Sequence, residues 1–120
     1  MPGVIPKGTL LYHGGNDTRV PSGPEWASTD PEHSYLFCRR DFSFFRPEEL
    51  CWHLTLATTR PLKVVYFDGS SAAKIKYGPI DTQNLLAWGK ARAEDIWEEL
   101  QLIEDLCTWG KGFGVDGFVR

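Results

Sequence analysis

The residues best placed to do chemistry lie near the start of the chain, where His13 is followed by Gly14 and Gly15. Residues 8–13 predict a strand, because they are rich in types that suit an extended, half-buried backbone. We expect the glycine pair to break that strand and to let another molecule approach the main chain closely. A histidine at an open strand end, beside bare backbone, is suited to fixing the orientation of a ligand.

A second segment, residues 25–37, supplies groups that can work with this histidine. Residues 25–28 predict a short strand. The helix that follows runs to about Arg40 and starts either at an Asp30 cap with Pro31 in the first turn or at a capping box of Thr29 and Glu32.

The rest of the chain predicts an α+β fold, with antiparallel strands and flanking helices. Residues 1–7 are expected to be loosely ordered and residues 14–24 to form a surface loop. Alternation over residues 50–57 predicts a strand with Trp52, Leu54 and Leu56 against the core and His53 on the other face, as a structural or solvent-side residue. A turn joins it to a strand at residues 62–67, which suggests an antiparallel hairpin.

Two helices are expected in the second half. Residues 81–89 predict a short helix closed by Gly89. Residues 91–109 predict the longest helix, ended by Gly110, with an apolar stripe at Ile96, Leu100, Ile103 and Cys107. A glycine-rich turn then leads into a strand at Phe118. Because that strand starts on the last residues, we expect the chain to be a piece of a longer protein or of a two-chain assembly.

Composition limits the classes of function. The 120 residues carry a net charge of −3 and no basic run longer than Arg39–Arg40, which disfavours a nucleic-acid partner. The length fits a single domain spanning residues 1–120. No apolar run is long enough for a membrane span and no secretory signal is visible, so we expect a cytoplasmic location. The cysteines are Cys38, Cys51 and Cys107; free buried thiols are the simpler interpretation, with one disulfide and an odd thiol as the alternative.

Three motifs together resemble the ADP-ribosyltransferase fold, in particular its His-type branch, which includes the poly-ADP-ribose polymerases. Residues 11–14 (Leu-Tyr-His-Gly) look like that family's opening strand. Residues 26–35 look like its second strand and the helix after it. Residues 112–119 (Gly-Phe-Gly-Val-Asp-Gly-Phe-Val) resemble the Asp-Gly turn before a late strand of the fold.

The resemblance implies that NAD is the substrate and that His13 is the catalytic residue that orients the nicotinamide ribose. Gly14 and Ser34 would hold the carboxamide, and Tyr35 or Phe37 would stack on nicotinamide. His13 and Ser34 would then line one cleft. The family's catalytic glutamate has no counterpart before Arg120, and Glu25 could replace it only in a rebuilt pocket. We therefore expect ADP-ribosyl transfer or NAD glycohydrolysis, with the stabilising carboxylate supplied by a further segment or by a second chain that completes the sheet.

Two other classes of function stay open. A non-catalytic protein-interaction module would use an aromatic-rich surface around Phe42, Phe44, Phe45 and Trp52. A metal hydrolase would use His13, His33 and His53, although their spacing matches no established ligand pattern.

Overall fold

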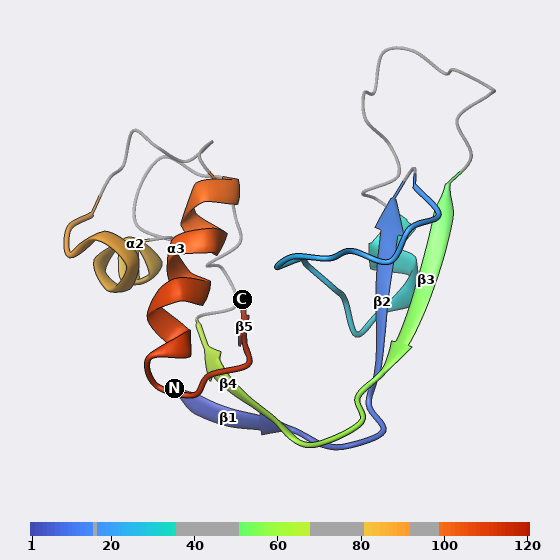
Figure 1. Ribbon diagram of the computed structural model, residues 1–120, viewed down its shortest axis with the longest axis horizontal. Coiled ribbons are helices and arrows are strands. Elements are labelled where there is room, and N and C mark those ends of the chain that lie inside the picture. Colours follow the sequence, from blue (N-terminus) through green and yellow to red (C-terminus); the bar gives the residue numbers. More distant parts are fainter. Residues whose placement is uncertain (16, 36–50, 68–80, 92–98) are drawn as a thin grey trace, which may run out of the picture. The chain divides into compact units, whose positions relative to one another are not determined.

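The computed structural model describes residues 1–15, 17–35, 51–67, 81–91 and 99–120 of the chain (Figure 1). In chain order the elements are β1 (Pro2–Ile5), β2 (Leu10–Gly15), α1 (Pro31–Tyr35), β3 (Trp52–Ala57), β4 (Leu62–Tyr66), α2 (Asp81–Trp88), α3 (Glu99–Lys111) and β5 (Gly117–Val119). This mixture of helices and mostly antiparallel strands confirms the predicted α+β class. The described residues belong to two compact units, one of residues 1–5 and 61–120 and the other of residues 6–60.

The first unit is built on a three-stranded sheet in the order β1-β4-β5. β1 pairs antiparallel with β4, from Pro2 opposite Val65 to Ile5 opposite Leu62, and β5 lies parallel to β4. The prediction of a loosely ordered start was therefore wrong. The four residues of β1 are too few to show a periodic pattern, and their order comes from the hydrogen bonds that β4 offers along its edge.

The core of this unit lies between the sheet and the helices. Phe67, Leu102 and Leu106 are buried together, and Phe118 from β5 packs against them. The predicted α3 stripe was wrong at Leu100, which is 68% exposed, whereas Leu102 and Leu106 are 4% and 2% exposed. Two residues along a helix turn the side chain by roughly 200°, so Leu100 and Leu102 cannot share a face.

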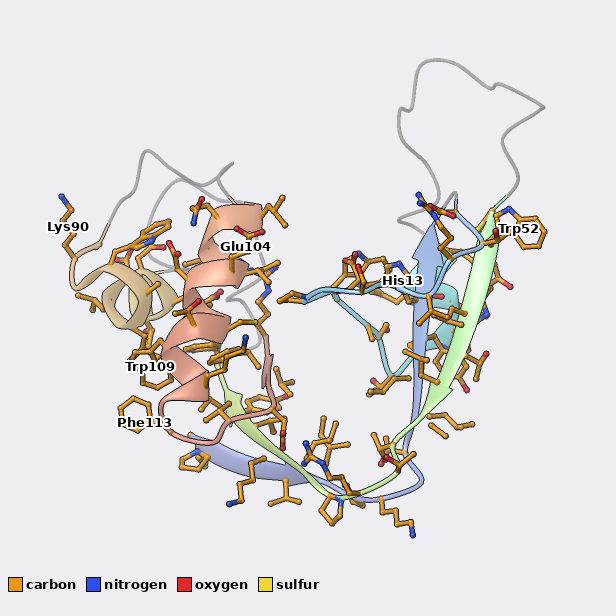
Figure 2. The ribbon with its side chains drawn as sticks, in the orientation of Figure 1. His13, Trp52, Lys90, Glu104, Trp109 and Phe113 are labelled. Carbon is orange, nitrogen blue, oxygen red and sulfur yellow. The ribbon has the colours of Figure 1, made fainter. Side chains whose placement is uncertain are left out.

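Gly89 and Gly110 have different roles at the ends of α2 and α3. Gly89 adopts φ +70° and its N–H bonds to the carbonyl of Leu85 at 2.9 Å, which confirms the predicted end of α2. Gly110 does not end α3, which continues to Lys111. Its missing side chain instead makes room for Phe118, because a Cβ there would lie 3.1 Å from that ring. At the end of α3, the ring centroids of Trp109 and Phe113 lie 4.9 Å apart; both residues are labelled in Figure 2.

We expect Gly114→Ala to destabilise this unit by about 1–2 kcal/mol, because Gly114 adopts φ +66°, where a Cβ is strained. Gly112→Ala is the matched control, since φ is not positive there and its Cβ would meet the Trp109 carbonyl oxygen at 3.4 Å. Urea unfolding of both variants measures the difference. Equal losses of stability in the two variants would contradict the assignment of strain to Gly114.

The second unit contains the antiparallel pair of β2 and β3. Leu10 lies opposite Ala57 and Gly15 opposite Trp52. The predicted hairpin between residues 50–57 and 62–67 was wrong, because β3 pairs with β2 while β4 pairs with β1 and β5. Pairing stops at Pro6 and Pro61, neither of which has an N–H to donate to a ladder.

Candidate functional site

His13 lies on β2 with its imidazole held in one orientation (Figure 2). Its Nδ1 is 2.9 Å from the carbonyl oxygen of Trp26. Because a carbonyl can only accept, Nδ1 carries the hydrogen, and Nε2 of the neutral ring is an acceptor. The Trp26 ring lies against the imidazole, with centroids 4.6 Å apart. Nε2 sits over Gly15, where a Cβ would be 3.6 Å away.

The N–H and C=O groups of Gly14 face the edge of β2 that lies away from β3. Tyr12 exchanges two hydrogen bonds of 2.7 Å with Ser28, so its peptide groups point away from β3. Peptide groups two residues apart in a strand point the same way, and those of Gly14 therefore face this edge too. In the described part of the chain no main-chain bond meets Gly14 there, since the Trp26 carbonyl accepts from His13 instead. Gly14 thus presents a donor and an acceptor side by side.

The prediction that Gly14 and Gly15 would break the strand was wrong. β2 continues through Gly14 and Gly15, which pair with His53 and Trp52. The glycines remain extended because β3 continues opposite both of them. The predicted strand end at residue 13 was therefore wrong by two residues.

This continuation separates the two side chains that were expected to share a cleft. Residues opposite each other in an antiparallel pair share a face, and faces alternate along each strand. His13 lies opposite Leu54 on one face, whereas His53 lies opposite Gly14 on the other. Ser34 is hydrogen-bonded to His53 at 2.6 Å. The expected cleft between His13 and Ser34 was therefore wrong, and Gly14 is the site group that stays next to His13.

Ser34 is committed to holding α1 against the sheet. Its side chain is completely buried, and its Oγ lies 2.6 Å from both the Pro31 carbonyl oxygen and Nε2 of His53. The hydroxyl has one hydrogen, which it donates to the carbonyl, so Nε2–H of His53 donates to Oγ. α1 starts as predicted at Asp30, whose carboxylate accepts the N–H of Glu32 at 2.9 Å.

The aromatic candidates also lie on the Ser34 face. Tyr35 stacks on His53 with centroids 4.7 Å apart, and Tyr12 stacks on the same imidazole at 5.4 Å. Tyr35 is 50% exposed, so part of its ring is open to solvent. Phe37, the other stacking candidate, lies outside the described residues, as do Phe42, Phe44 and Phe45.

We expect Ser34→Ala to destabilise the protein by about 1–3 kcal/mol, because it leaves the Nε2–H of His53 without its acceptor. Thr108→Ala is the control, since its hydroxyl also bonds to a helix carbonyl, that of Glu104 at 3.0 Å, but at an exposed position. Urea unfolding followed by tryptophan fluorescence gives both values. A Ser34→Ala variant as stable as Thr108→Ala would show that the His53 bond contributes nothing.

Glu25, Asp17 and Arg19 make local hydrogen bonds with their neighbours in the sequence. Glu25 accepts the N–H of Trp26 at 3.1 Å. In the loop after β2, the Arg19 guanidinium lies within hydrogen-bond distance of Asp17 and lowers the pKa of that carboxyl. In the described residues no group of three or more His, Cys, Asp or Glu side chains could hold a metal ion, and His13 and His53 lie on opposite faces.

The cysteines differ from the simpler expectation. Cys107 is a free thiol, as predicted, and burial raises its pKa while the charge of Lys111 opposes that shift. Cys51 is disulfide-bonded, so the prediction of a free thiol was wrong there. Cys38 lies outside the described residues. No helix in the described ranges is long and apolar enough to cross a membrane.

Two partners in this region were not anticipated from the sequence. Trp26 was recognised only as part of a motif, although its carbonyl fixes the tautomer of His13. His53 was expected to be structural or solvent-side, and its bond to Ser34 gives it the structural role. No residue pattern signals either contact, because each joins segments that are far apart in the chain.

The chain belongs to the family described as the YPL277C N-terminal domain, which it matches over residues 1–51 and 43–120. Along its whole length it is 35% identical to the uncharacterized protein YOR389W of Saccharomyces cerevisiae and 34% identical to the uncharacterized protein YPL277C of the same yeast. It spans 25% of the first relative and 33% of the second. No solved structure shows a significant match.

Proposed function

We propose that this domain binds an NAD-type nucleotide by its nicotinamide ribose end and takes part in ADP-ribosyl transfer or NAD glycohydrolysis. One observation carries the proposal: the unpaired edge of Gly14 lies next to an imidazole whose tautomer is set by Trp26. A rigid pair of peptide groups and a fixed acceptor suit a ligand with both an amide and a hydroxyl.

The edge of Gly14 is complementary to a carboxamide. The Gly14 N–H can donate to the carboxamide oxygen, and the Gly14 carbonyl can accept from its NH₂ group. Gly14 is buried, and a buried peptide group without partners is costly, so a ligand that supplies both bonds is stabilised there. The support for this contact comes from strand pairing, which does not involve Ser34.

The role of His13 follows from its tautomer. With Nδ1–H donating to Trp26, Nε2 accepts a hydrogen bond from a ribose hydroxyl. Both contacts come from consecutive residues of one strand, so nicotinamide and ribose would be held in a fixed relation. Ser34 is assigned no ligand contact, because its hydroxyl is buried and donates to Pro31. Tyr35 is assigned no contact at this site either, because it stacks on His53 on the opposite face. Stacking on nicotinamide by Phe37, which lies outside the described residues, stays a prediction.

Cleavage of the nicotinamide–ribose bond needs a further group. Nicotinamide leaves with the bonding electrons, and the ribose passes through an oxocarbenium-like state that a carboxylate stabilises. Water or an acceptor side chain then bonds to the ribose carbon and loses a proton. We propose that a further segment or a second chain supplies the carboxylate.

Comparison of nicotinamide with nicotinic acid tests the proposal. We expect nicotinic acid to bind roughly 10- to 100-fold more weakly by calorimetry, because its carboxylate cannot donate to the Gly14 carbonyl. We expect Gly15→Ala to weaken NAD binding as well, since its methyl group would lie 3.6 Å from Nε2 of His13. Gly3→Ala is the control, with a Cβ at 3.6 Å from Val64 in the other unit. If neither nicotinamide nor NAD binds the wild type, the proposal is wrong.

A second candidate function is a protein-interaction module. Its support is the face of β3 that carries Trp52 and Leu56, which are 46% and 39% exposed although this face was expected to lie against the core. The test is a partner that copurifies with the wild type and is lost in Trp52→Ser, while NAD leaves the melting temperature unchanged.

A further inference from the structure

We infer that the disulfide at Cys51 is a redox switch on the site at Gly14, an inference that rests on the proposed function. Cys51 is disulfide-bonded and immediately precedes Trp52, the first residue of β3. Trp52 lies opposite Gly15, and these two residues form one end of the pairing between β2 and β3. The disulfide therefore tethers β3 at the end where Gly14 lies.

The main chains of Gly15 and Trp52 bond to each other. The peptide groups of Tyr12 bond to Ser28 and point away from β3. Peptide groups alternate in direction along a strand, so those of Gly15, three residues further on, point toward β3 and its partner Trp52. These bonds hold the backbone directly after Gly14, so the donor and acceptor of Gly14 keep their direction while the pair is closed.

Without a tether, this pair opens easily. Hydrogen bonds at the end of a strand pairing open at a lower free energy than those further in. Gly14 and Gly15 lose more conformational freedom in a strand than other residues would, and they have no side chain to pack. Trp52 is 46% exposed, so much of its ring gains no burial when the pair closes. A disulfide next to Trp52 lowers the entropy of the open state and favours the closed pair.

A dithiol can reduce this disulfide. Cys51 is exposed, so a thiolate in solution can reach it. The thiolate attacks the disulfide and forms a mixed disulfide, which the second thiol of the same molecule resolves. Two electrons and two protons pass to the two cysteine sulfurs of the protein, and the dithiol leaves as its own disulfide. Cys107 is a free thiol and takes no part in the exchange, so the partner of Cys51 lies outside the described residues.

Opening of the pair removes the fixed geometry on which the site depends. Nε2 of His13 lies over Gly15, at 3.6 Å from the position of a Cβ there. Once Gly15 leaves β3, the peptide groups of Gly14 lose their fixed direction relative to the imidazole. The affinity for a ligand then falls in proportion to the fraction of molecules in which the pair is closed. The oxidised protein is therefore the binding form.

Amide hydrogen exchange followed by NMR tests the tether without any ligand. We expect dithiothreitol to speed the exchange of the Gly15 and Trp52 amides in the wild type by roughly tenfold or more, because their bonds lose the tether. The amides of Leu11 and Leu56, which pair four residues further along the strands, should stay protected and show that the protein remains folded.

Calorimetry with NAD, with and without dithiothreitol, tests the effect on the site in the wild type, Cys51→Ser and Cys107→Ser. The reduced wild type should bind NAD at least about threefold more weakly, which corresponds to a pair that is open in most molecules. Cys51→Ser should bind as the reduced wild type does under both conditions. Cys107→Ser is the matched control, because it keeps the disulfide and should respond to dithiothreitol as the wild type does.

The outcomes separate the switch from the proposed function. If dithiothreitol leaves the exchange of Gly15 and Trp52 unchanged, the switch is wrong, while NAD binding still supports the proposed function. If exchange accelerates but the affinity for NAD stays the same, the pair does not control the site and the switch is again wrong. If NAD binds neither redox form, the proposed function fails, and the control of nucleotide binding fails with it.

Discussion

The His13→Ala variant is expected to lose the thermal stabilisation that NAD gives the wild type. A ligand present at a hundred times its dissociation constant stabilises the folded state by about 2.7 kcal/mol, which is readily seen as a rise in melting temperature. Removing the imidazole removes the acceptor proposed for the ribose hydroxyl and also the Nδ1 hydrogen bond to the Trp26 carbonyl. Both changes act on the same site, so the effect on NAD binding should be large.

Two isosteric variants separate these contributions. The side-chain amide of asparagine can reproduce the donor at Nδ1, so His13→Asn should keep the bond to Trp26 and still lose NAD binding. Glutamine reaches closer to the position of Nε2, and His13→Gln should retain part of the affinity. The opposite ranking, with His13→Asn binding better than His13→Gln, would mean that Trp26 and not a ligand is the important partner of His13.

Leu106→Ala is expected to cost about 2–5 kcal/mol of unfolding free energy, a large share of the stability of a small protein. Leu106 is 2% exposed and belongs to the buried cluster with Phe67 and Leu102. Truncation removes buried methyl groups and leaves a cavity that the sheet and α3 cannot fully close. Urea unfolding measures the loss.

Leu100→Ala is the matched control on the same helix. Leu100 is 68% exposed, so its truncation should change the stability by no more than about 0.5 kcal/mol. A large loss for Leu100→Ala together with a small one for Leu106→Ala would support the stripe predicted from the sequence over the observed packing.

Much of the local structure could be predicted from short-range chemistry. The Asp30 cap of α1 and the Gly89 end of α2 depend on single residues and their immediate neighbours, and both are confirmed. Strand pairing depends on residues far apart in the chain. The pairing of β1 with β4 and of β2 with β3 therefore differed from the hairpin that chain adjacency suggested.

The same limit applies to the candidate site. The sequence predicted that His13 stands beside main chain that a ligand can approach. The face on which each side chain lies depends on the register between β2 and β3, which the sequence does not reveal. That register carries Ser34 and Tyr35 with His53, away from His13. The resemblance to the ADP-ribosyltransferase fold stays a prediction, because it also depends on residues 112–119, which take no part in the pairing of β2 with β3.

Titration of the ¹⁵N-labelled protein with NAD, followed by NMR, tests the central claim most directly. If Gly14 and His13 form one nucleotide site, NAD should shift the amide resonances of Gly14 and Gly15 and the imidazole resonances of His13, and should leave Ser34 and His53 nearly unchanged. Shifts confined to Ser34, Tyr35 and His53, or no shifts at saturating NAD, would contradict it.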